Sequence, residues 1–497
     1  MITERRRLFL GTSWTFASTL VALVVGAILN PVLVLYLGVG GYGIWASAIA
    51  VASLFGMAGD LGVSGALTKL MSEREAKREK AGSFVASSLV FGVIAGGITG
   101  FALAVVARFV EVSSGYSNFG LLLELQALQM PFNMGTASLL GLLQGRRHFR
   151  ELALLTMVQS AGGLSLSIVF LATGQGLIGV MVASSLASVL VFAILLTLSR
   201  QEIALGSLPM IKADLRRLIP FGIKLTATNA VSTILYQVDI VVLSFLTGDP
   251  VSVGTYALAI FITRAFWILP GSVSTTTYPV TSQYAAANDW RRVSTFVSTA
   301  FLGSIAIIGV LASALILFGR PVLLGVFGPT SLGAYDMSLI LLAGTCALGC
   351  LRSIASSISG VGRPGVGLRV SAVGAGALAI LSILLTRAFG TLGTAIAVTL
   401  TFSLVAILLV RAVDRHVLGP AGTRLVTNKV VRTATVALAG GAASLFLSLP
   451  PAPSLGAVVV ASVLLTGVGV ALGSVSGGRD TWGGFLHFPR RAQSERE

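Results

Sequence analysis

Long apolar segments separated by short polar connections recur along the whole chain. Most of them have the length of about 17 to 25 residues that a helix needs to cross a hydrocarbon core roughly 30 Å thick. The predicted segments are 12–36, 43–67, 83–107, 119–143, 151–172, 177–198, 218–246, 252–280, 294–318, 337–359, 370–386, 392–410, 433–449 and 455–474. Because a helix satisfies its own backbone hydrogen bonds in lipid, the pattern predicts an all-α integral membrane protein with about 14 transmembrane helices.

The amino-acid composition supports a membrane protein. Hydrophobic residues make up 55% of the 497 residues and charged residues only 10%, with a mean hydropathy of +0.92, whereas soluble domains carry roughly 25% charged residues. The first apolar segment is too long for the hydrophobic region of a signal peptide, so we expect it to be retained as a helix. The two cysteines, Cys346 and Cys350, lie four residues apart in an apolar segment, where we expect helix packing rather than a disulfide framework or a metal site.

The distribution of the 34 Lys and Arg residues predicts the orientation. If the N-terminus is inside and the connections alternate between the two sides, most of these residues fall inside, and only Arg108, Arg320 and Arg387 fall outside. Basic residues accumulate on cytoplasmic loops. We therefore expect a multi-pass protein of the cell (inner or plasma) membrane with both termini in the cytoplasm. The net charge of +16 then reflects topology, and we do not expect nucleic-acid binding.

Weak internal similarity divides the chain into two parallel halves. Short stretches match in the same order at offsets of 211 to 215 residues, with glycines aligned as Gly43 with Gly254, Gly145 with Gly360, and Gly179 with Gly393. Duplicated bundles that pivot about a central cavity are typical of transporters with alternating access. The predicted parts are an N-terminal six-helix lobe at 1–200, a C-terminal six-helix lobe at 201–415, a helix pair at 416–475 and a cytoplasmic tail at 476–497. The alternative is chance resemblance among glycine-rich helices.

Several stretches resemble one known family. They are PVLVLYLGVGGYGIWA near the start, DLG at 60–62, LLQGRRHFREL, YQVDIVVLSFLTGDPVSVGTYALA, and GVGRP at 360–364. Together they resemble the polysaccharide transporter (oligosaccharide flippase, O-antigen type) family of the multidrug, oligosaccharidyl-lipid and polysaccharide exporter superfamily, over nearly the whole chain up to about residue 415. O-antigen flippases of this family look twelve-helical and lipid II flippases have fourteen helices. This chain combines the larger count with loops like the former, which leaves the sugar open.

The resemblance implies a function. It implies export of polyprenyl-diphosphate-linked oligosaccharides from the cytoplasmic to the outer leaflet, by a transporter that uses no cofactor and performs no enzymatic reaction. It also implies a setting in cell-surface polysaccharide biosynthesis, with membrane lipids, a polysaccharide polymerase and glycosyltransferases as candidate partners.

Three cations within the predicted helices are candidate ligands for the diphosphate. A charge in mid-membrane costs roughly 2.5 to 3.5 kcal/mol on insertion scales, so it usually faces a cavity or a partner. Lys224, Arg264 and Arg352 are such residues, and Arg forms charge-assisted hydrogen bonds with phosphate. Pairing with an acid such as Asp239, or snorkelling to a headgroup, is the alternative.

Five other residues are weaker candidates. Trp267, Tyr236 and Gln237 offer stacking and hydrogen bonds to sugars, although aromatic residues in membrane helices more often pack or anchor at interfaces. Asp60 and Asp239 are candidate ion-coupling acids, since the chain has no GxxxxGK[ST] nucleotide loop and transport needs another energy source. A helix-end contact is the alternative for Asp60.

Two other function classes remain in view. A cation-coupled multidrug antiporter of the same superfamily is the nearer alternative, but a cationic drug needs an acid-rich cavity and the second half of this chain is rich in cations. A membrane enzyme acting on lipid-linked sugars is the more distant alternative. Its reaction would require a cluster of catalytic side chains, and no nucleophile with a base or metal-ligand cluster is visible in the sequence.

Overall fold

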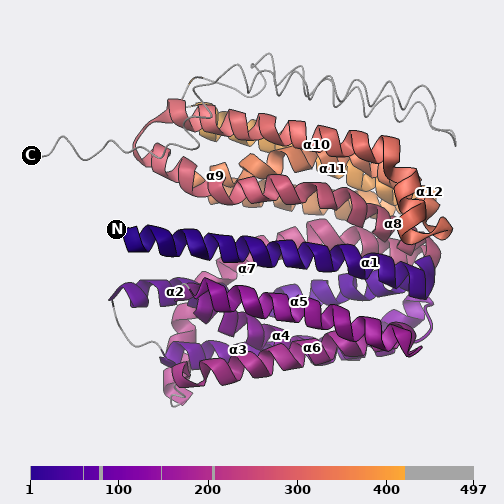
Figure 1. The fold of residues 1–497 in the computed structure, drawn as a ribbon, viewed down its shortest axis with the longest axis horizontal. Coiled ribbons are helices and arrows are strands. Elements are labelled where there is room, and N and C mark those ends of the chain that lie inside the picture. The colour runs from indigo at the N-terminus through magenta and orange to yellow at the C-terminus, as the bar shows by residue number, and fades with distance from the viewer. Residues whose placement is uncertain are drawn as a thin grey trace, which may run out of the picture. The chain divides into compact units, whose positions relative to one another are not determined.

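The computed structural model describes residues 2–59, 61–77, 82–146, 148–203, 208–419 and 422, and these residues form helices without any strand. In order they are α1 (Ile2–Gly59), α2 (Val63–Lys77), α3 (Gly82–Ser114), α4 (Phe119–Gly145), α5 (Phe149–Ala172), α6 (Gly176–Ser199), η1 (Arg200–Glu202), α7 (Leu208–Thr247), α8 (Pro250–Arg264), η2 (Ala265–Trp267), α9 (Ile268–Ala286), α10 (Trp290–Phe327), η3 (Pro329–Ser331), α11 (Leu332–Gly360), α12 (Pro364–Val413) and η4 (Asp414–Leu418). Figure 1 shows these helices with their labels.

The predicted all-α membrane class is confirmed. Within the described part, nine helical segments are long and apolar enough to cross a membrane. The predicted segments from 12 to 410 fall in the helices from α1 to α12, although the second runs past the end of α1 into α2 and the segment at 119–143 is α4, which is not one of the nine. The segments predicted at 433–449 and 455–474 lie outside the described residues. The total of 14 helices therefore stays a prediction.

Left-handed glycines mark places where one predicted segment gives way to the next. The first predicted segment and most of the second are part of α1, which turns at Gly38 (φ 70°), and the eleventh and twelfth are both part of α12, which turns at Gly390 (φ 58°). A glycine accepts a positive φ at no steric cost, so the helix can change direction without a loop. Short connections therefore leave these consecutive segments close together.

The second predicted segment ends earlier than expected. It was predicted to reach residue 67, but α1 ends at Gly59 and the chain turns through Leu61 (φ 42°) and Gly62 (φ 66°) before α2. The turn allows a close approach to α7, since a Cβ on Gly62 would collide with the carbonyl oxygen of Gly222. The basic stretch that follows was expected to be a loop, yet it is helical as far as Lys77.

The chain divides into two compact units, Met1–Ala257 and Leu258–Glu497, with the division inside α8. In the first unit α4 packs against α2, α3 and α6, and α1 packs against α5 and α7. In the second unit α11 packs against α9, α10 and α12. In each unit, one helix therefore packs against at least three others, α4 in the first unit and α11 in the second.

Six of the left-handed glycines form three pairs with the spacing of the predicted repeat. They pair as Gly38 with Gly248, Gly115 with Gly328, and Gly176 with Gly390. The separations of 210, 213 and 214 residues match the offsets found among the sequence stretches. These turns are consistent with a duplication, and the boundaries of the two lobes stay a prediction.

One pair of aligned glycines lies in direct contact within the first unit. A Cβ on Gly43 would lie 2.6 Å from Gly254 N and 3.0 Å from Gly254 Cα, and a Cβ on Gly254 would collide with the carbonyl oxygen of Val39. Beside this contact, Ser47 Oγ of α1 and Ser244 Oγ of α7 are 2.6 Å apart. The absence of side chains on both glycines thus permits α1 and α8 to touch backbone to backbone.

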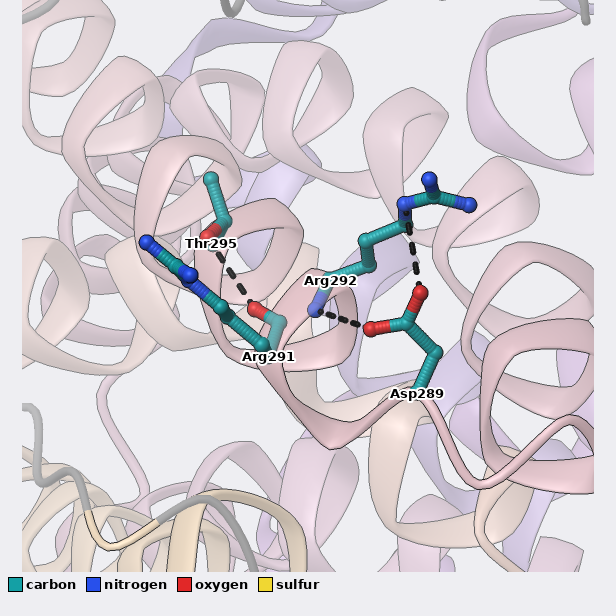
Figure 2. A network of polar contacts seen from close by, with 4 residues as sticks. All are labelled: Asp289, Arg291, Arg292 and Thr295. Atoms are coloured by element: carbon teal, nitrogen blue, oxygen red, sulfur yellow. Dashed lines mark hydrogen bonds and ion pairs between the residues drawn. The ribbon is translucent and has the colours of Figure 1, made fainter.

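In the second unit, the start of α10 shows how a polar connection is ordered. Asp289 is the N-cap, and its Oδ1 accepts a hydrogen bond from Arg292 N at 3.1 Å, while its Oδ2 lies 3.2 Å from Arg292 Nε (Figure 2). Thr295 Oγ1 donates to the carbonyl oxygen of Arg291 at 3.0 Å in the same turn. The cap satisfies a backbone N–H that the helix itself leaves without an acceptor.

Candidate functional site

Trp267 is the centre of the candidate site in the second unit. It ends the short 3-10 turn between α8 and α9 and is only 7% exposed. Its Nε1 donates a hydrogen bond to the carbonyl oxygen of Thr345 on α11 at 2.8 Å. Gly349 leaves room for the indole, because a Cβ there would lie 2.7 Å from Trp267 Cδ1. Phe402 of α12 packs against the indole with 5.5 Å between ring centroids, so α11 and α12 together hold the ring in place.

Two guanidinium groups converge on this ring. Arg264 Cζ lies 5.9 Å from the centroid of Trp267, and Arg352 Cζ lies 5.1 Å from it. Both distances are within the range of roughly 6 Å for cation–π attraction. The Nε and Nη2 atoms of Arg264 and the Nε of Arg352 are buried. Two cations on one rigid aromatic ring, inside membrane-spanning segments, create a local positive charge suited to a phosphate-like anion.

The structure brings together three of the predicted site residues. Arg264, Trp267 and Arg352 belong to one cluster in the second unit, although Arg352 comes from a different helix, α11. Tyr236 and Gln237 lie on α7 in the first unit and are partly exposed. Their predicted contact with sugars stays a prediction, as does the stacking of Trp267 on a sugar.

The remaining predicted residues have different positions. Asp239 on α7 is completely buried, and its Oδ2 accepts a hydrogen bond from Tyr256 Oη at 2.6 Å. Lys224 is also on α7, but its side chain lies outside the described part, and Asp60 lies outside the described residues. The coupling roles predicted for Asp60 and Asp239 therefore stay predictions.

Sequence reasoning missed the residues that orient the tryptophan. Thr345 contributes only a backbone carbonyl, and Gly349 contributes only space. Neither residue type is unusual in a membrane helix, and both lie far along the chain from Trp267. The one available signal was the three-residue spacing of Arg264 and Trp267, which places them on one side of a helical turn.

The amino-acid sequence is similar to those of known proteins of polysaccharide biosynthesis. A family model described as polysaccharide biosynthesis protein matches residues 8–285. The probable low-salt glycan biosynthesis flippase Agl15 of Haloferax volcanii is 24% identical to this chain over 383 residues, which cover 75% of this chain and 76% of that protein.

Solved transporters share the fold. The lipid II flippase MurJ, in an inward closed conformation, aligns with a TM-score of 0.68 at 17% identity over 95% of this chain and 100% of that one. An inward-facing multidrug resistance MATE family transporter of the MOP superfamily aligns with a TM-score of 0.63 at 16% identity over 82% of this chain and 96% of that one. The family match spans more than half of the 497 residues, so the chain belongs to the polysaccharide biosynthesis protein family.

Proposed function

We propose that this protein is a flippase that moves a polyprenyl-diphosphate-linked oligosaccharide from the cytoplasmic to the outer leaflet for cell-surface polysaccharide biosynthesis. The observation that carries the proposal is the pair of guanidinium groups, Arg264 and Arg352, held on Trp267. The family match and the flippase names of the similar proteins point the same way.

The chemistry of the cluster favours a lipid-linked diphosphate. A diphosphate carries several oxygen acceptors, and Arg can bind two of them at once in a planar fork. Trp267 positions both side chains before any ligand arrives, which reduces the cost of ordering them on binding. Lys224 is proposed as a third ligand on the basis of its place in the sequence.

A cation-coupled multidrug antiporter is the second candidate, because a MATE transporter shares the fold. The same cluster argues against it. A cationic drug near Arg264 and Arg352 would be repelled, whereas an anionic headgroup would be attracted. Binding of an anionic ligand at Arg264 and Arg352 would therefore distinguish a flippase from a multidrug antiporter.

The proposed mechanism is alternating access between two six-helix lobes at 1–200 and 201–415, with both termini in the cytoplasm and the protein in the inner or plasma membrane. The recurring left-handed glycines support the duplication. An ion gradient or the membrane potential supplies about 2.3 kcal/mol per charge per 100 mV, without ATP. Polysaccharide polymerases and glycosyltransferases are the proposed partners, since they consume and supply such lipids.

The test uses purified protein in vesicles that contain a polyprenyl-diphosphate-linked disaccharide. Arrival of the lipid in the opposite leaflet is measured by cleavage with an added glycosidase. We expect Arg264→Ala and Arg352→Ala to reduce transport at least about tenfold, because each removes a charged hydrogen-bond donor that contributes about 1.5–3 kcal/mol. Arg352→Lys should restore transport only in part, because a point charge replaces a fork.

Arg387→Ala is the matched control, since Arg387 is an exposed arginine of α12. It should transport as the wild type does. Normal transport by folded Arg264→Ala and Arg352→Ala would contradict the proposed site. Transport of an organic cation in preference to the lipid would favour the antiporter.

A further inference from the structure

A buried hydrogen bond joins the two segments of α1. Tyr42 Oη donates to Asn30 Oδ1 at 2.8 Å, across the turn at Gly38. Tyr42 is 2% and Asn30 is 7% exposed. The Asn30 amide also donates from Nδ2 to the carbonyl oxygen of Gly26 at 2.7 Å. This bond, the first clasp, links the helical segment before a left-handed glycine to the segment after it.

A bond of the same kind joins α7 to α8. Tyr256 Oη donates to Asp239 Oδ2 at 2.6 Å, across the turn at Gly248, and both side chains are 0% exposed. This bond is the second clasp. It uses the same donor as the first clasp, a tyrosine hydroxyl, and differs in the acceptor.

The two clasps are analogous rather than superimposable. In the repeat alignment that matches the contacting glycines, Tyr256 corresponds to Trp45, so Tyr42 lies about one helical turn earlier. Asn30 lies eight residues before Gly38, and Asp239 lies nine residues before Gly248. Within the same unit, a neutral amide therefore performs the bridging task that Asp239 performs with a carboxyl group.

The second clasp lies close to the contact between α1 and α8. Tyr256 lies two residues after Gly254, the glycine that touches Gly43 of α1, and Asp239 lies five residues before Ser244, which contacts Ser47. Fixing α8 against α7 therefore sets how the glycine of α8 meets α1. Loss of the clasp would allow the two helices to splay, and the backbone contact would loosen.

We infer that Asp239 is a positioning residue whose task is to accept the Tyr256 hydrogen bond that holds α8 against α7, and that transport requires this acceptor rather than the charge of a carboxylate. The inference assigns Asp239 a role different from the ion coupling considered from the sequence. It does not depend on which lipid the protein carries.

Three variants of the full-length protein test the inference: Asp239→Asn, Asp239→Leu and Tyr256→Phe. Their melting temperatures in detergent are compared with those of the wild type, and their transport of a polyprenyl-diphosphate-linked disaccharide is measured in vesicles. Asp239→Asn keeps an acceptor oxygen, so we expect an unchanged melting temperature and transport within about twofold of the wild type. Asp239→Leu and Tyr256→Phe each remove one partner of the bond and leave the other buried without it, so both variants should melt earlier and transport at least about fivefold more slowly. Tyr36→Phe, at a tyrosine that is 58% exposed, is the matched control and should behave as the wild type.

Each other outcome is decisive. Asp239→Asn that folds normally but does not transport would show that the ionisable carboxyl is needed, and this would overturn the inference. Failure of Asp239→Asn to fold would overturn it too, since an amide would then be unable to form the clasp. Tyr256→Phe that matches Tyr36→Phe in melting temperature would show that the bond positions nothing. If the wild type does not move the probe lipid, the proposed substrate is wrong, and the melting temperatures still decide the clasp.

Discussion

Replacing Gly254 by alanine should open the contact between α1 and α8. The new Cβ would lie 2.8 Å from the carbonyl carbon of Val39 and 3.0 Å from Gly43 N, whereas carbon atoms in ordinary contact are about 3.5 to 4.0 Å apart. The atoms in the way belong to backbone, so the helices must separate by about 1 Å. Overpacking of this kind costs about 1–3 kcal/mol. Alanine stabilises a helix by only about 0.5–1 kcal/mol relative to glycine. The cost of the collision should therefore exceed this gain, and the substitution should be destabilising.

The size of the penalty sets the expected shift. A change of about 1–3 kcal/mol alters an equilibrium between a closed and an open contact by about 5- to 150-fold. A cysteine at Ser47 reports on this equilibrium, because Ser47 is 0% exposed and lies one turn from Gly43. The Ser47→Cys protein should react slowly with a membrane-impermeant maleimide added from outside, and addition of Gly254→Ala should accelerate the reaction.

The matched control is Gly162→Ala in α5, where an added Cβ meets nothing within 4 Å. It should leave the labelling of the Ser47 cysteine unchanged. Equal labelling rates with and without Gly254→Ala, in proteins that melt at the same temperature, would refute the idea that this glycine contact closes the α1 and α8 pair.

Three further outcomes are expected. The Asp249 side chain accepts from Ser252 and from the backbone N–H groups of Val251 and Ser252, which lowers the pKa of its carboxyl. Its stabilising effect is therefore present above the unfolded pKa of about 3.9 and is lost as pH falls through the folded pKa. The melting temperature of Asp249→Asn should thus lie below that of the wild type at neutral pH and converge with it below about pH 4; parallel curves would contradict this. Asp289→Ala should lower stability by about 1 kcal/mol through loss of the α10 cap. Arg292→Ala should have a smaller effect on the melting temperature, because the Arg292 side chain is 70% exposed. A disulfide between cysteines introduced at Leu37, in the proposed lobe 1–200, and at Thr247, in the proposed lobe 201–415, should stop transport until it is reduced. Transport by a fully crosslinked sample would rule out rocking of these two lobes.

The helices were predictable because the bilayer imposes a simple length and composition on each one. Hydropathy located the segments from 12 to 410, but it did not reveal that the chain turns at Gly38 within α1 without any polar loop. Nor did it separate the end of α1 from α2, since that turn depends on the approach of Gly222 from α7. Contacts between helices that are distant in sequence leave no local pattern in composition.

The candidate site was predictable to a similar degree. Arg264 and Arg352 stood out as cations in apolar surroundings, because such residues are costly in a membrane and rarely lack a function. Their meeting on Trp267 could not be predicted, since it requires α11 to pack beside the turn between α8 and α9. The role of Asp239 was also hidden, because its partner Tyr256 is on the next helix at a spacing that is not helical.

The position of the arginine cluster has an evolutionary consequence for a duplicated chain. Counted back by 211 residues, the offset that aligns Gly254 with Gly43, Arg264 corresponds to Ser53, whose hydroxyl donates to the carbonyl oxygen of Ile49 in its own helix. After a duplication, the residues that bind the ligand need to be retained in only one copy, whereas a close backbone contact between the copies restricts substitutions in both. Among relatives, we expect substitutions at Ser53 to accumulate freely, while Gly43 and Gly254 change rarely and together. Specialisation of one copy would then allow a change of cargo without rebuilding the scaffold.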